Sequence, residues 1–295
     1  MGVAILAAMA IPLRTVAVAA QPGSRPARSV YREFAAPDAL RLAVACTWEG
    51  RVGWAPRTLR VLPDGCVDLV WDGERLSVAG AATVAVRQAL GGRGRNVGLR
   101  LRPGAAGAIL GWPARELPAE GLALEALWGA SARDVEAELA VAANAERAVL
   151  ERAVARRIDA GSRPDPLVLA AAARLGHPDT NVAAVARATG LSTRELRRRC
   201  ADHVGYGPKA LHRVLRFHAF VRRVRTQAAS GDGLARIAAE LGYADQAHLT
   251  RECRAISGST PAVLAAASGR NLQATAAPPA DPLPHDQSDP RARTK

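Results

Sequence analysis

Cysteines and acidic residues are scarce in this sequence of 295 residues. The four cysteines lie far apart with no C-x-x-C pair, which argues against a zinc knuckle and against a disulfide-rich secreted scaffold. No run reaches the roughly 18 to 20 apolar residues that a membrane-spanning helix needs. We therefore expect reduced, mostly buried thiols in a chain that does not cross a membrane.

Acidic residues number 27 against 40 lysines and arginines, so the formal charge of the chain is +13. Such an excess implies an anionic partner, either nucleic acid or a membrane surface. The positive charge is concentrated in residues 191–225, where ten basic side chains are accompanied by only Glu195 and Asp202. This stretch predicts a local basic surface.

The first 29 residues lack the pattern of a folded domain. An apolar run at residues 3–11 resembles a signal peptide, but the basic n-region is missing and Arg14 follows the apolar stretch. Residues 21–29 are rich in proline, glycine, serine and arginine, as in a linker. Export stays an alternative, and we expect a disordered or over-extended segment over residues 1–29 with folded sequence from Tyr31.

A β-rich domain with a helical connection is predicted for residues 30–160. In residues 59–71 (LRVLPDGCVDLVW) two β-branched runs flank a Pro-Asp-Gly turn and should pair, and residues 76–79 begin another strand. Residues 91–98 (GGRGRNVG) predict a hairpin turn and no dinucleotide loop, because G-x-G-x-x-x-G is not the required spacing. Apolar and basic residues alternate over residues 97–102, which predicts a half-buried strand.

Helices are predicted after this strand. Residues 105–110 and 124–128 suit short helices, and residues 130–158 form one long, alanine-rich stretch with near-helical apolar spacing. Residues 161–166 (GSRPDP) break this pattern. We place the boundary between the two domains at this break.

An internal repeat dominates the predicted all-α domain, residues 165–267, while the polar residues 268–295 are expected to form a disordered tail. The repeat relates residues 185–208 to residues 237–261. In both copies an alanine lies four residues before a glycine, and a cysteine precedes a glycine by five residues and a proline by eight. The second copy has one extra residue after its first glycine, so its turn should be longer.

Each copy has the form of a helix-turn-helix unit. The glycine supplies a positive φ, and Ser192 or Asp245 should cap the second helix by accepting backbone N–H groups. One polar helix face has an ordinary explanation as a solvated surface, but two matching copies favour DNA major-groove contact. At about 100° per residue, the outer sides carry Arg194, Arg197 and Arg198 in the first copy, and Ala247, Arg251 and Arg254 flanked by His248 and Thr250 in the second.

Residues 208–226 predict one helix that joins the two copies, with four residues on its inner side: Leu211, Val214, Leu215 and His218. At about 1.5 Å per residue this helix spans roughly 28 Å, which would set two reading helices near one DNA turn, about 34 Å, apart. The expected fold class is α+β: a β-rich N-terminal domain followed by an all-α domain of two helix-turn-helix units joined by a long helix.

The run GYADQAHLTREC at residues 242–253, followed by GSTP, resembles the AraC family of bacterial transcription regulators, most strongly over residues 181–264. The resemblance implies a DNA-binding domain of two helix-turn-helix units. Its base-reading positions fall on Arg194, Arg197, Arg198, Gln246, Ala247, His248 and Arg251, with Thr250 beside them. Phosphate contacts are predicted for basic residues on or near the joining helix and for Arg254; the former are Lys209, Arg213 and Arg216.

Two cysteines depart from the family pattern, and the resemblance also extends to the N-terminal part of the chain. Cys200 and Cys253 stand where the family commonly has phenylalanine, which would leave smaller side chains in the core. Residues 31–128 look like the N-terminal domain of a subgroup of the family. This likeness implies a ligand-sensing or regulatory β-rich module with a small-molecule effector.

The predicted function is a cytoplasmic, sequence-specific transcription regulator that binds double-stranded DNA and has no catalytic activity, cofactor or metal site. RNA polymerase and a second copy of the chain are left open as further partners. One alternative is an alkylation- or redox-sensing regulator with Cys66 or Cys46 as nucleophile, although Cys66, Asp64 and Asp68 also suit structural roles. Another alternative is a nucleoid-type binder without sequence preference.

Overall fold

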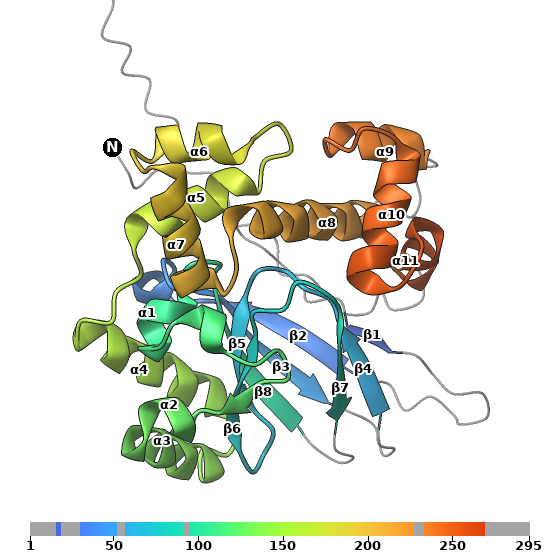
Figure 1. Ribbon diagram of the computed structural model, residues 1–295. Coiled ribbons are helices and arrows are strands. Elements are labelled where there is room, and N and C mark those ends of the chain that lie inside the picture. The colour runs from blue at the N-terminus through green and yellow to red at the C-terminus, as the bar shows by residue number, and fades with distance from the viewer. Residues whose placement is uncertain (1–15, 19–29, 52–56, 91–94, 227–232, 269–295) are drawn as a thin grey trace, which may run out of the picture.

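The computed structural model describes residues 16–18, 30–51, 57–90, 95–226 and 233–268 (Figure 1). A β-rich N-terminal region is followed by an all-helical C-terminal region, so the predicted α+β fold class is confirmed. Of the helices within these ranges, none combines the length and apolar character that crossing a membrane requires.

The described strands of the N-terminal region form two antiparallel sheets. The larger has the strand order β2 (Val30–Ala35), β3 (Val44–Arg51), β8 (Arg95–Leu101), β5 (Val67–Trp71), β6 (Leu76–Gly80) and β9 (Leu122–Ala123). The smaller has the order β1 (Val16–Val18), β4 (Arg57–Val61) and β7 (Val86–Leu90). The segment 1–29, expected to be disordered or over-extended, therefore contributes β1, and its other residues lie outside the described ranges.

Both predicted hairpins are wrong, while the strand predicted at residues 76–79 is present as β6. β4 and β5 flank the Pro-Asp-Gly turn, but β4 pairs with β7, and β5 pairs with β6 and β8. β7 and β8, which flank residues 91–94, also belong to different sheets. Turn residues fix where a strand ends, whereas contacts made far along the chain decide which strand it pairs with.

The described residues of this region also form four α-helices and two short 3-10 helices: η2 (Asp38–Leu40), α1 (Ala106–Leu110), η3 (Ala114–Glu116), α2 (Glu125–Trp128), α3 (Ala130–Ala140) and α4 (Glu146–Asp159). The two predicted short helices are confirmed by α1 and α2. The helical connection predicted over residues 130–158 is confirmed, but it is not continuous. Ala143 and Asn144 adopt φ angles of +42° and +82°, which a right-handed helix does not allow, so the stretch divides into α3 and α4.

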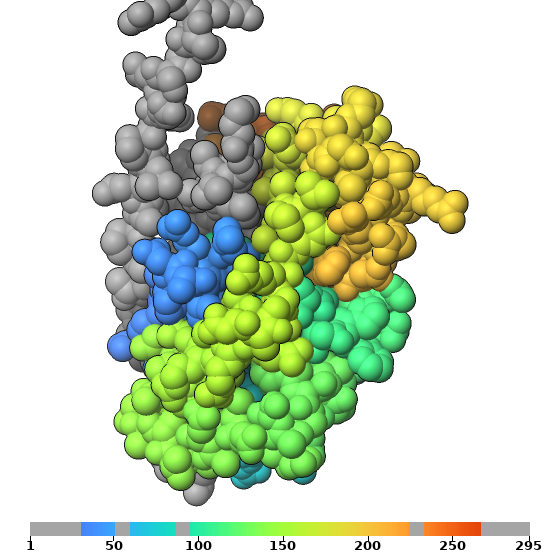
Figure 2. Space-filling model, turned by 90° about the vertical axis from the view of Figure 1, so that its left-hand side faces the viewer, coloured from blue at the N-terminus to red at the C-terminus, as the bar shows by residue number. Residues whose placement is uncertain are grey.

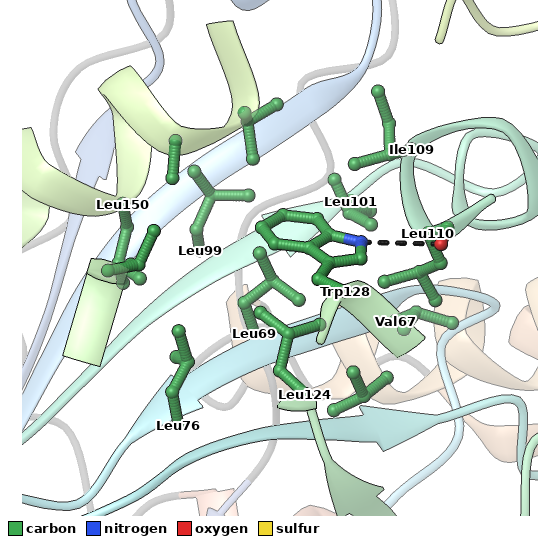
Figure 3. Packing of buried hydrophobic residues seen from close by; sticks show 14 of the residues in the cluster. Val67, Leu69, Leu76, Leu99, Leu101, Ile109, Leu110, Leu124, Trp128 and Leu150 are labelled. Carbon is green, nitrogen blue, oxygen red and sulfur yellow. Dashed lines mark hydrogen bonds between the residues drawn. The ribbon is translucent and has the colours of Figure 1, made fainter. Parts of the chain in front are cut away.

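One face of the larger sheet carries the main hydrophobic core (Figure 3). Leu69 of β5 and Leu99 of β8 lie on this face and are fully buried. Alternate side chains of each strand point to this same side of the sheet. Trp128 of α2 packs over them and donates its indole N–H to the backbone carbonyl of Leu110 in α1, at 3.3 Å. The short helices are thereby fixed on the sheet.

The opposite face of the same strands is charged yet buried. Arg100 of β8 is 0% exposed, and its Nε lies 3.1 Å from Asp68 Oδ1 on the neighbouring strand β5. Its Nη1 lies 3.1 Å from Glu33 Oε1 on β2. The alternation predicted over residues 97–102 is present, but the prediction of a half-buried strand is wrong, since ion pairing lets the basic side of β8 be buried as well.

The C-terminal region contains α5 (Pro166–Leu175), α6 (Val182–Ala188), α7 (Thr193–Val204), α8 (Pro208–Thr226), α9 (Leu234–Glu240), α10 (Gln246–Ser257) and α11 (Pro261–Ser268). The predicted joining helix over residues 208–226 is confirmed by α8, which buries the four predicted inner residues. Figure 1 shows α6 and α7 at one end of α8, and α9 and α10 at the other. Apart from Ser268, the predicted tail lies outside the described residues.

Candidate nucleic-acid interface

The first helix-turn-helix unit is formed by α6 and α7. Asn181 caps α6 by accepting a hydrogen bond from the backbone N–H of Ala184, and Ser192 caps α7 by accepting one from Glu195, at 3.1 Å. Gly190 adopts a φ of +69° in the turn, as predicted. The apolar side of α7 is buried through Leu196, Cys200 and Val204.

The second unit repeats this construction with α9 and α10. Asp245 accepts a hydrogen bond from the backbone N–H of His248 at 2.5 Å and caps α10, and Gly242 adopts a φ of +72°. Helix α10 begins four residues after Gly242, whereas α7 begins three residues after Gly190, so the longer second turn is confirmed. The inner side of α10 buries Leu249, Cys253 and Ile256.

The outer side of α7 is strongly basic. The three predicted base-reading residues of this helix are all exposed: Arg194, Arg197 and Arg198. Arg199 points to the other side and donates to Glu195 through Nε and Nη2, at 3.0 and 2.7 Å. Arg199 also pairs with Asp165 at 2.5 Å and therefore ties α7 to the start of α5. Arg198 lies 3.6 Å from Asp202, and with Arg194 and Arg197 it forms the exposed basic surface.

The outer side of α10 is more varied in its chemistry. Gln246, Ala247 and Arg251 are exposed, while His248 and Thr250 are partly exposed. Nδ1 of His248 accepts a hydrogen bond from the backbone N–H of Ala244 at 3.3 Å, so the neutral ring carries its proton on Nε2 and presents a donor. The Thr250 hydroxyl donates to the carbonyl of Gln246 at 2.9 Å, which leaves its methyl group and oxygen lone pairs for contact.

The residues predicted to contact phosphate fall into two groups. Lys209 and Arg254 are exposed at the surface. Arg213 instead forms an ion pair with Glu252 of α10 at 2.7 Å, and Arg216 donates to the carbonyl of Gly242 at 3.1 Å. These last two arginines tie α8 to the second unit, a structural use that the sequence pattern did not indicate.

Contacts of the N-terminal domain with α7 and α10 were also missed. Arg60 of β4 donates to the backbone carbonyl of Ser257 at 2.8 Å, across 197 residues of sequence. Arg115 of η3 forms an ion pair with Asp202 of α7. Neither arginine lies in a repeat or a periodic pattern, so no local signal could have identified it.

The cysteines do not form a reactive site. Cys46 and Cys66 are 5% and 4% exposed, and burial raises the pKa of the Cys46 thiol to about 12 and that of Cys66 well above its ordinary value. Both are therefore protonated at neutral pH, and protonated thiols are poor nucleophiles, which disfavours the alkyl-acceptor alternative. Within the described residues, no three His, Cys, Asp or Glu side chains are grouped to hold a metal ion.

Comparisons with known proteins find two family models and solved structures of ToxT. Residues 167–267 match the family model of a helix-turn-helix domain, and residues 32–122 match a domain of unknown function, DUF6597. No curated protein matches the chain. A crystal structure of ToxT from Vibrio cholerae O395 shares 9% identity over 81% of this chain and 97% of that chain, with a TM-score of 0.39. Unsaturated fatty acid bound ToxT from Vibrio cholerae strain SCE256 shares 9% identity over 82% of this chain and 96% of that chain, with a TM-score of 0.37.

A helix-turn-helix domain with a basic outer surface defines a DNA-binding protein, and this chain is a DNA-binding transcription regulator. Its C-terminal domain is of the AraC type, so the resemblance found in the sequence is confirmed. The roles of single residues in reading bases or contacting phosphates stay predictions.

Proposed function

We propose that the chain is a sequence-specific regulator that reads two successive major-groove segments of one duplex, with α7 in one segment and α10 in the next. The observation that supports this proposal is the pair of capped helices at opposite ends of α8, each with an exposed polar outer side. Helix α8 has 19 residues and is about 28 Å long, which suits groove segments about 34 Å apart.

The exposed side chains suggest a division of roles. Arg194, Arg197 and Arg198 can each bridge guanine O6 and N7, and Gln246 can pair with adenine. The His248 Nε2–H group suits an acceptor on a base edge or a phosphate. Lys209 and Arg254 would add affinity without reading sequence. In this proposal the chain acts in the cytoplasm and has no catalytic activity.

Selection of bound duplexes from a random pool with the full chain tests the proposal. We expect enriched duplexes that contain two preferred blocks about one helical turn apart, and footprints that protect both blocks. Titrations with increasing salt, comparing a selected duplex with a random one, would then show a higher affinity for the selected duplex at every salt concentration. Equal affinity for both duplexes would identify a nucleoid-type binder instead.

A further inference from the structure

The C-terminal end of α7 rests on the N-terminal domain. Asp202 forms its ion pair with Arg115 of η3, and α1 passes so close that a Cβ added at Gly107 would lie 2.3 Å from the Asp202 carbonyl oxygen. A Cβ added at Gly205 would lie 3.1 Å from the carbonyl oxygen of Ala114. Figure 2 shows the yellow to orange surface of this unit seated on the green surface that follows β8. The first reading helix is therefore held by close backbone packing.

The C-terminal end of α10 is held by the smaller sheet. Arg60 of β4 donates to the carbonyl of Ser257 and to the hydroxyl of Ser259, both at 2.8 Å. The backbone N–H of Ala85, just before β7, donates to the carbonyl of Ile256 at 2.7 Å. These bonds satisfy carbonyl groups that a helix C-terminus leaves without intrahelical partners, and the arginine charge is favourable at that end of the helix.

The connection between β4 and β5 also contacts the joining helix. Leu62 is 2% exposed and belongs to the same buried cluster as Phe217 and Phe220 of α8. A Cβ added at Gly65 would lie 3.1 Å from Leu211 of α8. The N-terminal domain therefore contacts both reading helices and the helix between them.

These contacts leave the predicted base-reading side chains exposed, although Asp202, the partner of Arg115, also lies 3.6 Å from Arg198. The contacts involve the C-terminal ends of α7 and α10, whereas Arg194 and Gln246 lie in the first turns of these helices and are exposed. The N-terminal domain therefore does not block the reading surface. Its contacts restrict instead how far each helix can move relative to the other.

We propose that the N-terminal domain fixes the spacing between the two reading helices, with Arg60 and Arg115 as positioning residues. The proposal depends on the proposed function only in that spacing matters when both helices contact one duplex. Preorganised helices bind a duplex of matching spacing without a further ordering cost. One inserted base pair shifts the second segment by about 3.4 Å and turns it by about 35°, so a rigid pair of helices should reject it.

Label distances test the rigidity without DNA. Nitroxide labels at Ala183→Cys and Ala239→Cys, exposed positions on α6 and α9, should give one narrow distance distribution in the otherwise unchanged full chain. Adding Arg60→Ala and Arg115→Ala should broaden this distribution at least twofold. The matched control Arg75→Ala removes an exposed arginine on the β5–β6 turn and should leave it unchanged. Far-ultraviolet circular dichroism checks that each variant is folded. If a variant that carries Arg60→Ala is not folded, the milder pair Arg60→Lys and Ser259→Ala takes its place.

A spacing titration carries the test to DNA. The unchanged chain should bind a selected duplex at least tenfold more tightly than the same duplex with one base pair inserted between its two blocks. In the Arg60→Ala, Arg115→Ala variant this ratio should fall below threefold. A narrow distance distribution and an unchanged ratio in that variant would overturn the proposal. If the unchanged chain selects no duplex, the proposed function fails, and the label distances alone decide whether the N-terminal domain fixes the helices.

Discussion

The two helix-turn-helix units share one plan and differ in their surroundings. The first presents three arginines on the outer side of α7, and its core is formed with α5 and α8. The second presents a mixture of amide, imidazole, hydroxyl and guanidinium groups, and its core includes Leu62 of the N-terminal domain. In the proposed function, the arginine-rich helix would supply strong binding and guanine contacts, and the mixed helix would discriminate among bases. Both units contact the N-terminal domain, the first through α1 and η3 and the second through β4.

The largest expected difference concerns the cores of the two units. Leu196→Ala and Leu249→Ala each remove a fully buried side chain, and we expect the free energy of unfolding to fall by about 2–5 kcal/mol in each case. Only Leu249 shares its cluster with Leu62, so Leu249→Ala should also loosen the contact between the second unit and β4. Denaturant unfolding of the full chain measures the first effect, and amide hydrogen exchange along β4 measures the second.

The control for these variants is Leu42→Ala, because Leu42 is 48% exposed. Its effect on the free energy of unfolding should stay within about 0.5 kcal/mol. If Leu196→Ala increased exchange along β4 as much as Leu249→Ala did, the two units would not differ in their coupling to β4.

The next effect concerns base reading. Arg251→Ala should cost about 1–3 kcal/mol on a selected duplex and relax the preference at one base position in the block read by α10. Arg197→Ala should do the same in the other block. Repeating the selection with each variant locates the relaxed position. Equal losses on selected and random duplexes for Arg251→Ala would instead assign this residue to phosphate contact.

The helical domain could be predicted closely because its signals are local and occur twice. Ser192 and Asp245 cap the helices that they were expected to cap, and Gly190 and Gly242 form the turns. The residue bounds of α8 match the predicted helix. Each of these features depends on residues a few positions apart, where periodicity and capping chemistry act directly.

The β-rich domain could be predicted only in part because strand pairing depends on distant residues. The sequence indicates β4, β5, β6 and β8, but no local feature shows that β4 and β5 join different sheets. Arg100 resembles a solvent-facing residue in the alternating pattern, yet Asp68 and Glu33 from two other strands allow its burial. The contacts of Arg60 and Arg115 with the reading helices depend on the docking of two domains and have no counterpart in local spacing.

The smallest expected effect concerns two basic residues of α8, the helix between the two units, and whether they contribute to DNA affinity. Lys209 is exposed near the start of α8, so Lys209→Ala should weaken binding to all duplexes alike and reduce the slope of log affinity against log salt by about 0.9. Arg213 lies one turn further along but is paired with Glu252, so Arg213→Ala should leave that slope nearly unchanged and instead loosen α10 from α8. Titrations at several salt concentrations compare the two variants. An equal fall in slope for both variants would mean that the Arg213–Glu252 ion pair opens when DNA binds, so that Lys209 and Arg213 both contact phosphate.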